Sequence, residues 1–304
     1  MPVPRKLVLT LSFTLLLAGC HQAPPSSPAN STAADSSAAT KSYPIRGKII
    51  SVTGSSVLLD HEAVPGFMEA MTMSYKLKDP TIVSELHPGD RITATLLVTK
   101  DADGFTTAVL DKIVVIAQAK PDYKPTVQYH VPQAGDPVPD FKLLNQSGRT
   151  IHLSQFQGKV LLITFIYTRC PLDDFCPRMS RNFAEVDKAL ATDPALYTTT
   201  HLLSISFDAT YDTPRVLRSY GQAYVGHSPK DIFQHWDFAA PNAADLAALT
   251  QFFNVGITPG DSQSITHSLS TVLIGKDGKI AAWYPTNEWK PTDIVAQIRK
   301  AAVA

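Results

Sequence analysis

Apolar and polar residues follow two different patterns in the two halves of the chain. In the first half, five runs rich in β-branched and aromatic residues are separated by turn sequences such as Pro65-Gly66, which predicts short strands. The runs cover residues 45–52, 56–59, 71–77, 91–98 and 106–116. Five strands within about 75 residues predict a small all-β domain, and we expect an OB-like barrel over residues 43–117.

From residue 132 onwards, buried strands alternate with amphipathic helices. Continuous apolar runs are typical of strands that are buried on both faces, and two of the expected helices begin with a capping residue. We expect strands over residues 160–167, 201–207, 269–274 and 279–284, and helices that begin at Thr213, Asn242 and Pro291 or carry Met179, Phe183, Val186 and Leu190. This order, with a cysteine pair just after the first central strand, resembles the α/β thioredoxin fold.

The N-terminus carries an export signal. Arg5 and Lys6 precede the apolar residues 7–17, a run too short to span a bilayer. It ends in Leu17-Ala18-Gly19-Cys20, which resembles the lipobox of bacterial lipoproteins. The resemblance implies that residues 1–19 are a lipoprotein signal peptide and that Cys20 receives the lipid, although an ordinary signal peptide with an incidental cysteine is the alternative. We then expect a lipid-anchored protein on the periplasmic side of a bacterial membrane.

Composition refines the domain organisation. The 304 residues suffice for two domains, and 27 basic against 27 acidic residues give no net charge, so we expect no nucleic-acid partner. Residues 20–42 are mostly Ala, Ser, Pro and Thr and predict a disordered tether. Residues 118–131 contain Pro121 and Pro125 and no periodicity, which predicts a linker between the domains.

Three methionines and a histidine are concentrated in the first domain. Met71 and Met73 are two apart, so both side chains point to one face of a strand, with Met68 and His61 just before them. Thioether sulfur and imidazole together suit Cu(I) or Ag(I) better than Zn(II) or Mg(II). The alternative is that the methionines only fill the core.

The His…Met-Thr-Met pattern resembles the periplasmic copper-binding domains of the CusF type. The resemblance covers residues 43–117 and implies that His61, Met71 and Met73 bind copper. Those domains place a tryptophan against the metal, and residues 43–117 contain none. We therefore expect Met68 to add a third thioether. We also expect acid to weaken binding as His61 protonates near its ordinary pKa of about 6.5.

The other two cysteines lie where an expected strand passes into a helix. Five residues lie between Cys170 and Cys176, and a helix N-terminus favours the thiolate, the form that binds metals and attacks disulfides. Arg169 adds a positive charge, while Asp173 and Asp174 oppose it. A purely structural disulfide is the alternative.

Several motifs around this pair, in a fixed order, resemble the SCO family of membrane-tethered thioredoxin-fold proteins. They are Gly135-Asp136-Pro137-Val138-Pro139-Asp140-Phe141, the cysteine segment, Ser206-Phe207-Asp208 with Asp212-Thr213-Pro214, and His267. The resemblance spans residues 132–304 and implies that Cys170, Cys176 and His267 bind copper for delivery to cytochrome c oxidase. The usual spacing in that family is Cys-x3-Cys, and the two extra residues here change the strain of a disulfide and hence its redox potential. A structural role for His267, and a bracing role for Asp208 and Asp212, are the alternatives.

Three functions could use a cysteine pair with a histidine in a thioredoxin-like domain. We expect a copper chaperone, with the copper acceptor in subunit II of the oxidase or a similar protein as its partner. The alternative is a thiol-disulfide reductase that uses Cys170 and Cys176 as its redox pair and is itself reduced by a thioredoxin-like partner. Whether the protein is an enzyme is therefore left open. A peroxidase is disfavoured, because Tyr167 and Ile163 stand where that class needs a hydroxyl residue and a proline. The His/Met domain favours the chaperone.

Overall fold

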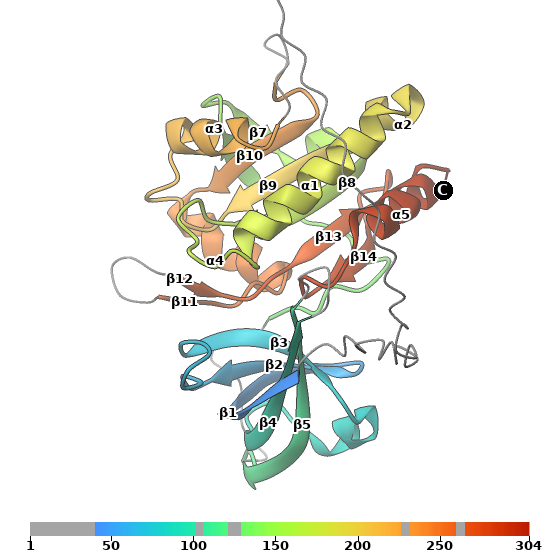
Figure 1. Cartoon of the computed structure of the whole chain (residues 1–304). Coiled ribbons are helices and arrows are strands. Elements are labelled where there is room, and N and C mark those ends of the chain that lie inside the picture. Colours follow the sequence, from blue (N-terminus) through green and yellow to red (C-terminus); the bar gives the residue numbers. More distant parts are fainter. Residues whose placement is uncertain (1–39, 101–105, 121–128, 226–231, 260–264, 304) are drawn as a thin grey trace, which may run out of the picture. The chain divides into compact units, whose positions relative to one another are not determined.

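The structure is a computed structural model that describes residues 40–100, 106–120, 129–225, 232–259 and 265–303 (Figure 1). All of these residues belong to one unit, residues 38–304. It contains a five-stranded β-barrel followed by a seven-stranded sheet with helices. In the part of the chain that is described, no helix is both long and apolar enough to cross a bilayer.

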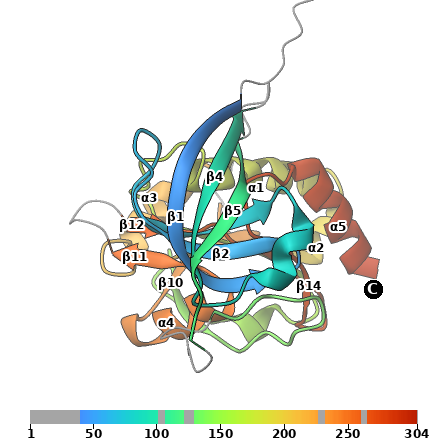
Figure 2. The ribbon, with the colours of Figure 1, turned by 90° about the horizontal axis from the view of Figure 1, so that it is seen from below.

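The five expected strands of the first domain form a closed barrel in the order β1-β2-β3-β5-β4. All neighbouring strands are antiparallel except β3 and β5. Figure 2 looks towards the barrel, with β1, β4 and β5 in front. The strands are β1 (Thr40–Thr53), β2 (Ser56–His61), β3 (Met71–Leu77), β4 (Arg91–Lys100) and β5 (Thr106–Ala117), with a 3₁₀ turn η1 (Pro80–Glu85) between β3 and β4. The all-β class expected for this region is confirmed.

The first strand begins earlier than its apolar pattern indicates. Thr40 pairs with Thr99 of β4, so three residues that the sequence assigned to the tether lie in β1. Strand pairing uses backbone groups, so a strand can include an exposed end with polar side chains. Such an end gives no hydrophobic signal in the sequence. Inside the barrel, Ile49, Leu59 and Tyr75 are among the fully buried side chains.

The second domain is built on a sheet in the order β14-β13-β8-β9-β10-β6-β7, in which β8, β9 and β10 are parallel. The three parallel strands are buried along their whole lengths. The strands are β6 (Lys142–Asn145), β7 (Thr150–His152), β8 (Val160–Ile166), β9 (Thr200–Ser206), β10 (Trp236–Pro241), β13 (Thr271–Ile274) and β14 (Ile280–Tyr284). A separate two-stranded hairpin contains β11 (Ile257–Pro259) and β12 (Ile265–His267).

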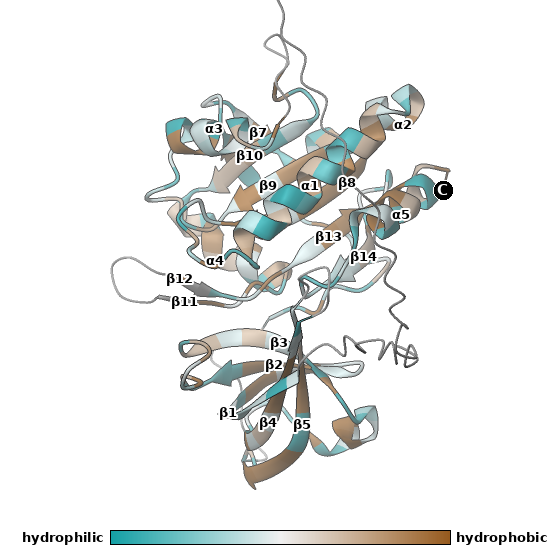
Figure 3. Cartoon of the chain, viewed as in Figure 1, coloured by the Kyte–Doolittle hydropathy of each residue, from teal (hydrophilic) through white to brown (hydrophobic). Residues whose placement is uncertain are grey.

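Helices cover this sheet. The helices α1 and α5 contact each other and β8, and α3 and α4 contact β10. Figure 3 shows a hydrophilic stripe on the outer side of α1, whereas its buried residues include Met179, Phe183 and Val186. The helices are α1 (Cys176–Ala191), α2 (Pro194–Thr198), α3 (Pro214–Gln222), α4 (Ala243–Phe252) and α5 (Pro291–Val303), with a 3₁₀ turn η2 (Leu153–Phe156).

The caps that the sequence predicts differ in their chemistry. Asn242 caps α4, since its side chain accepts a hydrogen bond from the backbone N–H of Asp245. Thr213 occupies the N-cap position of α3 but makes no such bond. Pro214 in the first turn lacks an N–H group and leaves one donor fewer to satisfy.

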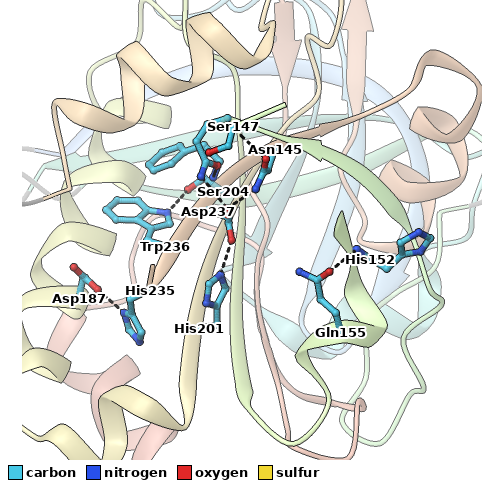
Figure 4. Close-up of polar contacts among 12 residues, drawn as sticks. Asn145, Ser147, His152, Gln155, Asp187, His201, Ser204, His235, Trp236 and Asp237 are labelled. Atoms are coloured by element: carbon cyan, nitrogen blue, oxygen red, sulfur yellow. Dashed lines mark hydrogen bonds and ion pairs between the residues drawn. The ribbon is translucent and has the colours of Figure 1, made fainter. Parts of the chain in front are cut away.

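A buried polar network lies within the sheet (Figure 4). Asp237 on β10 accepts hydrogen bonds from Asn145, Gln146 and His201 over 2.9–3.0 Å. Burial opposes ionisation of Asp237, but these bonds together hold its pKa below the ordinary value. The network ties β6 to β9 and β10, so the polar residue inside β10 is fully paired.

Candidate metal sites

Cys170, Cys176 and His267 come together although 97 residues of sequence separate the first from the last. Cys176 opens α1, Cys170 lies in the loop after β8, and His267 ends β12. The two sulfurs lie 3.8 Å and 3.4 Å from Nε2 of His267, and all three donor atoms are within 4.8 Å of one another. Two soft sulfurs and an imidazole nitrogen suit copper.

The ring of His267 is oriented for metal binding. Nδ1 lies 2.9 Å from the backbone carbonyl of Ser268. A carbonyl only accepts hydrogen bonds, so Nδ1 carries the proton and donates it. Nε2 therefore presents its lone pair to the two sulfurs, an arrangement that is usual for metal-binding histidines.

The two cysteines differ in burial and acidity. A hydrogen bond from the Cys176 thiol outweighs the effect of burial and lowers the pKa of Cys170 to about 4. Cys176 is completely buried, and this burial raises the pKa of its thiol. The pair therefore holds one thiolate, on Cys170, and one thiol, on Cys176.

Polar side chains hold the cysteine loop in place. Asp212 accepts hydrogen bonds from the backbone N–H and hydroxyl of Thr168 and from the hydroxyl of Ser206. Burial raises the pKa of Asp212. Asp212 thus braces the loop that leads to Cys170, in addition to its position ahead of α3.

The charges next to the cysteines are neutralised. Arg169 donates to Asp208 at 2.8 Å and stacks on the ring of Tyr211. Asp173 accepts a hydrogen bond from Arg181 at 2.9 Å. The sequence suggested that Arg169 and the acidic residues act on the thiols directly, but their pairing leaves the hydrogen bond between the thiols as the main cause of the low pKa of Cys170.

Aromatic rings surround the histidine. The ring centroids of Phe207, Tyr167 and Phe175 lie 4.7, 5.5 and 5.7 Å from that of His267. His267 is only 2% exposed. The imidazole is therefore held in an apolar setting, in which its interactions with neighbouring donors and charges are strengthened.

In the barrel, strand register brings His61 next to a methionine. His61 on β2 is directly opposite Met71 on β3, and Leu59 is opposite Met73. Directly opposed residues of antiparallel strands place their side chains on the same face, about 5 Å apart at Cβ. The structure therefore brings together the imidazole and the Met-x-Met pair that the sequence singled out.

His61 has a buried nitrogen with no hydrogen-bond partner. Its Nδ1 lies 2.7 Å from the Glu62 carbonyl and must donate to it, which leaves the lone pair on Nε2. That Nε2 is buried and unpaired among the described residues, and a buried polar atom without a partner is costly. Burial also lowers the pKa of His61 below 6.5. The expectation that it titrates at its ordinary pKa is thus wrong.

A short turn before β3 positions Met68, and Tyr75 on β3 contacts its sulfur. The backbone of Met68 pairs with that of Val64 around Gly66, which has a φ of 76°. The hydroxyl of Tyr75, a fully buried residue, donates to the Met68 sulfur at 3.5 Å, and the ring of Tyr75 lies 5.7 Å from that of His61. The ring of Phe67, the residue before Met68, stacks on that of Tyr43. Tyr75 was missed in the sequence, although its spacing of two and four from Met73 and Met71 was a usable signal.

The predicted ligands thus fall into two donor sets, named here by where they lie. The cysteine set, Cys170, Cys176 and His267, has its donor atoms within 4.8 Å of one another. The barrel set consists of His61 and Met71, which are opposite each other on β2 and β3, with Met73 on β3 and Met68, which Tyr75 of β3 contacts. Cys20 lies outside the described residues, as do residues 121–128 of the expected linker.

Family models match both regions of the chain. The model of SCO1/SenC matches residues 131–303, which is more than half of the chain. The model described as copper binding periplasmic protein CusF matches residues 42–112.

Curated proteins and solved structures resemble the second region. A SCO1 protein homolog of Bacillus subtilis is 28% identical over 169 residues, covering 54% of this chain and 82% of that protein. A copper-bound structure of ScoI from Bradyrhizobium japonicum is 23% identical with a TM-score of 0.45, covering 55% of this chain and 99% of that chain. BsSco, described as a member of the Sco family of cytochrome c oxidase assembly proteins, is 25% identical with a TM-score of 0.46, covering 57% and 98%. The thioredoxin-like α/β class expected for this region is confirmed.

Proposed function

The chain belongs to the SCO1/SenC family, and from that premise we propose that it is a copper chaperone for the assembly of the copper centre of cytochrome c oxidase. In this proposal, Cys170, Cys176 and His267 bind the copper that is delivered. The acceptor is subunit II of the oxidase or a protein with a similar copper site.

One observation carries the proposal. Two sulfurs and an imidazole nitrogen, from α1, the loop after β8 and β12, lie within 4.8 Å of one another, and the histidine directs its lone pair towards both sulfurs. A disulfide between Cys170 and Cys176 would not need the imidazole of His267 beside it. A copper ion with two sulfur ligands and one nitrogen ligand uses every one of these atoms.

We propose that the barrel holds a second, auxiliary Cu(I) site. The unpaired Nε2 of His61 supports this, because a metal would supply the partner that this buried atom lacks. Met71 is its cross-strand neighbour. Met73 and Met68 supply the other thioethers.

Copper titration of the whole purified protein tests both sites. The reduced protein should bind two Cu(I) ions per chain, and the protein with a Cys170–Cys176 disulfide should bind one, because oxidation removes both thiolates. Replacing both cysteines (Cys170→Ser, Cys176→Ser) should abolish one site, and Met71→Leu with Met73→Leu should abolish the other. The variant His267→Ala should weaken Cu(II) binding more than Cu(I) binding, because two thiolates can hold Cu(I) alone.

Matched variants control for folding. Met179→Leu replaces a fully buried methionine outside both donor sets, and His87→Ala replaces an exposed histidine of the barrel. Both should keep two coppers per chain. If the oxidised protein binds as many coppers as the reduced protein, the cysteine site is refuted.

A thiol-disulfide reductase is the second candidate, and the low pKa of Cys170 favours it. In that reaction the Cys170 thiolate attacks a disulfide of the partner, and one partner thiolate leaves. Cys176 then loses its proton to solvent and attacks the mixed disulfide. The second partner thiolate leaves, and Cys170 and Cys176 become a disulfide. A thioredoxin-like reductant would restore both thiols.

Trapping separates the two candidates. With Cys176→Ser a reductase should accumulate a mixed disulfide between Cys170 and a cysteine of the oxidase copper site. A chaperone should instead transfer copper to the reduced acceptor and leave its own cysteines reduced. The readouts are the mass of the trapped adduct and the copper content of the acceptor.

We also propose that the protein works on the periplasmic side of a bacterial membrane, held there by a lipid on Cys20. Its leader sequence and the match of the barrel region to a periplasmic copper protein support this location. The acceptor site of the oxidase would then be within reach of the same membrane face.

A further inference from the structure

A cavity of about 650 Å³ is lined by residues of both the barrel and the α/β domain. The barrel contributes Met68, Met71 and Met73, and the α/β domain contributes His267, Tyr167 and Phe175. One member of the cysteine site and three of the barrel site thus line the same cavity.

The strands that carry these residues contact each other. Strand β3, with Met71 and Met73, contacts β12, which ends at His267. Beside them, a Cβ atom at Gly256 would lie 2.8 Å from the side chain of Thr72. Glycine is therefore needed at residue 256 for this close approach.

Polar contacts join the barrel to the α/β domain at the cavity, which Thr106 and Asp174 line, and beside it, since Glu288 follows the lining residue Asn287. The hydroxyl of Thr106 donates to Asp174 at 3.0 Å, and Lys76 forms an ion pair with Glu288. The side chain of Lys76 is half-exposed. Exposed ion pairs contribute little stability, so the Lys76–Glu288 pair adds little to the attachment of the barrel to the α/β domain.

We propose that this cavity is a transfer chamber in which Cu(I) passes from the methionine site to the cysteine site of the same molecule without release to solvent. The inference rests on the proposed function of both sites. Two observations carry it: the shared cavity and the direct contact of β3 with β12. Thiolates bind Cu(I) more tightly than neutral thioethers do, which sets the direction.

The transfer is a ligand exchange without electron transfer. Copper stays Cu(I) throughout, its bonds to the thioethers and to Nε2 of His61 break, and bonds to Cys170 and Cys176 form. Cys170 is already a thiolate, and the thiol proton of Cys176 is released to water. His267 lines the cavity and contacts both sulfurs, so it can bind the ion between the two sites.

A capture experiment on the whole protein tests the chamber. The protein with oxidised cysteines is loaded with one Cu(I). The disulfide is then reduced with a phosphine in the presence of bathocuproine disulfonate, which captures Cu(I) from solution. Thiolate–copper absorption should appear without capture, at a rate that does not change on tenfold dilution, because the donor and acceptor are linked. In the variant with Cys170→Ser and Cys176→Ser the chelator should remove all of the copper.

Charge reversal at the Lys76–Glu288 pair provides a second test of the transfer chamber. Glu288→Lys should slow transfer about two- to fivefold, since it replaces an exposed attraction with a repulsion. Adding Lys76→Glu should restore the rate. The matched control is Asp111→Lys, which reverses the charge of one partner in the Lys78–Asp111 pair within the barrel. The side chains of that pair are 56% and 21% exposed, close to the 50% and 20% of Lys76 and Glu288. The control should leave the rate unchanged.

The outcomes distinguish this inference from the proposed function. Capture of the copper by the chelator during reduction, a rate that rises with protein concentration, or equal rates in Glu288→Lys and the unaltered protein would overturn the chamber. Each of these can occur while the reduced protein still binds two coppers. Loss of binding at either site would instead refute the proposed function.

Discussion

Asp212 is a buried carboxylate that holds the loop leading to the proposed copper site. It accepts three hydrogen bonds, two from Thr168 in the loop that leads to Cys170 and one from Ser206 at the end of β9. Asp212→Ala should destabilise the fold by about 1–3 kcal/mol, because it leaves buried donors unsatisfied. It should also weaken copper binding at the cysteine site, since the loop that carries Cys170 loses its brace.

The measurement pairs chemical denaturation with copper titration. Asp212→Asn keeps an acceptor oxygen and should give an intermediate loss, and Asp277→Ala at an exposed turn should change neither quantity. Copper binding in the barrel should be unaffected in all three. Unchanged affinity at the cysteine site in Asp212→Ala would show that the loop is positioned by other contacts.

His201 makes stability depend on pH. Burial lowers its pKa below 6.5, and the bond to Asp237 only partly offsets that effect. The unfolded chain therefore binds a proton at this residue more readily than the folded chain. The contribution of His201 is fully present above about pH 6.5 and is lost as the pH falls below that value towards its folded pKa.

Unfolding curves measured between pH 7.5 and pH 5 check this dependence. His201→Gln should flatten the decline, because it removes the titrating ring. The exposed His152→Gln should retain the decline seen in the unaltered protein. Equal slopes for His201→Gln and the unaltered protein would mean that other groups cause it.

At the scale of elements, Gly47 determines how closely β1 and β2 approach next to a metal site. It pairs with His61, and a Cβ at residue 47 would lie 2.6 Å from the carbonyl oxygen of Asp60. The same Cβ would lie 2.8 Å from the Cα of His61. Both neighbours are backbone atoms, which cannot move aside easily. Gly47→Val should therefore disrupt the strand pair at His61, lower barrel stability and weaken Cu(I) binding there.

Titration of the barrel site, with the cysteines oxidised, measures this effect. Ser51→Val on the same strand is the control, because residue 51 is half-buried and pairs with Leu58, away from the donors. It should retain one Cu(I) per chain. Full binding by Gly47→Val would show that β1 can shift without moving His61.

The strands that the sequence predicts are those whose residues are mainly apolar or β-branched. All five barrel strands and β8, β9, β13 and β14 belong to this group. β10 was missed because it contains Asp237, two alanines and Pro241. Its polar residue is satisfied by Asn145, Gln146 and His201, which are distant in sequence, and such pairing has no local signal. The short strands β6, β7, β11 and β12 were missed for lack of length.

The candidate sites were predictable where side-chain chemistry is unusual. Two cysteines, a methionine cluster and their histidines stand out in a chain with so few of them. The residues that orient the donors do not stand out. Ser268 and Glu62 act through their carbonyl groups, which every residue possesses, so only the folded chain reveals them.

At the scale of the whole molecule, the proposed attachment to the membrane depends on one atom, the sulfur of Cys20. If the lipobox is functional, Cys20→Ala removes the acceptor for the lipid, and the protein should no longer incorporate labelled fatty acid. Cys170→Ser should incorporate it normally, because its thiol follows the leader by 150 residues. Labelling of Cys20→Ala at the normal level would refute the anchor.

The unequal burial of the two sulfurs limits how far oxidants can damage the protein. Cys176 is 0% exposed, whereas Cys170 is partly exposed and ionised at neutral pH. A peroxide therefore meets Cys170 first and converts it to a sulfenic acid. The Cys176 thiol lies close enough to displace water from that group and form a disulfide, which a reductant can reverse. Further oxidation of Cys170 to sulfinic acid, which is irreversible, then competes with this disulfide. The two sulfurs of the proposed copper site therefore protect each other from permanent damage.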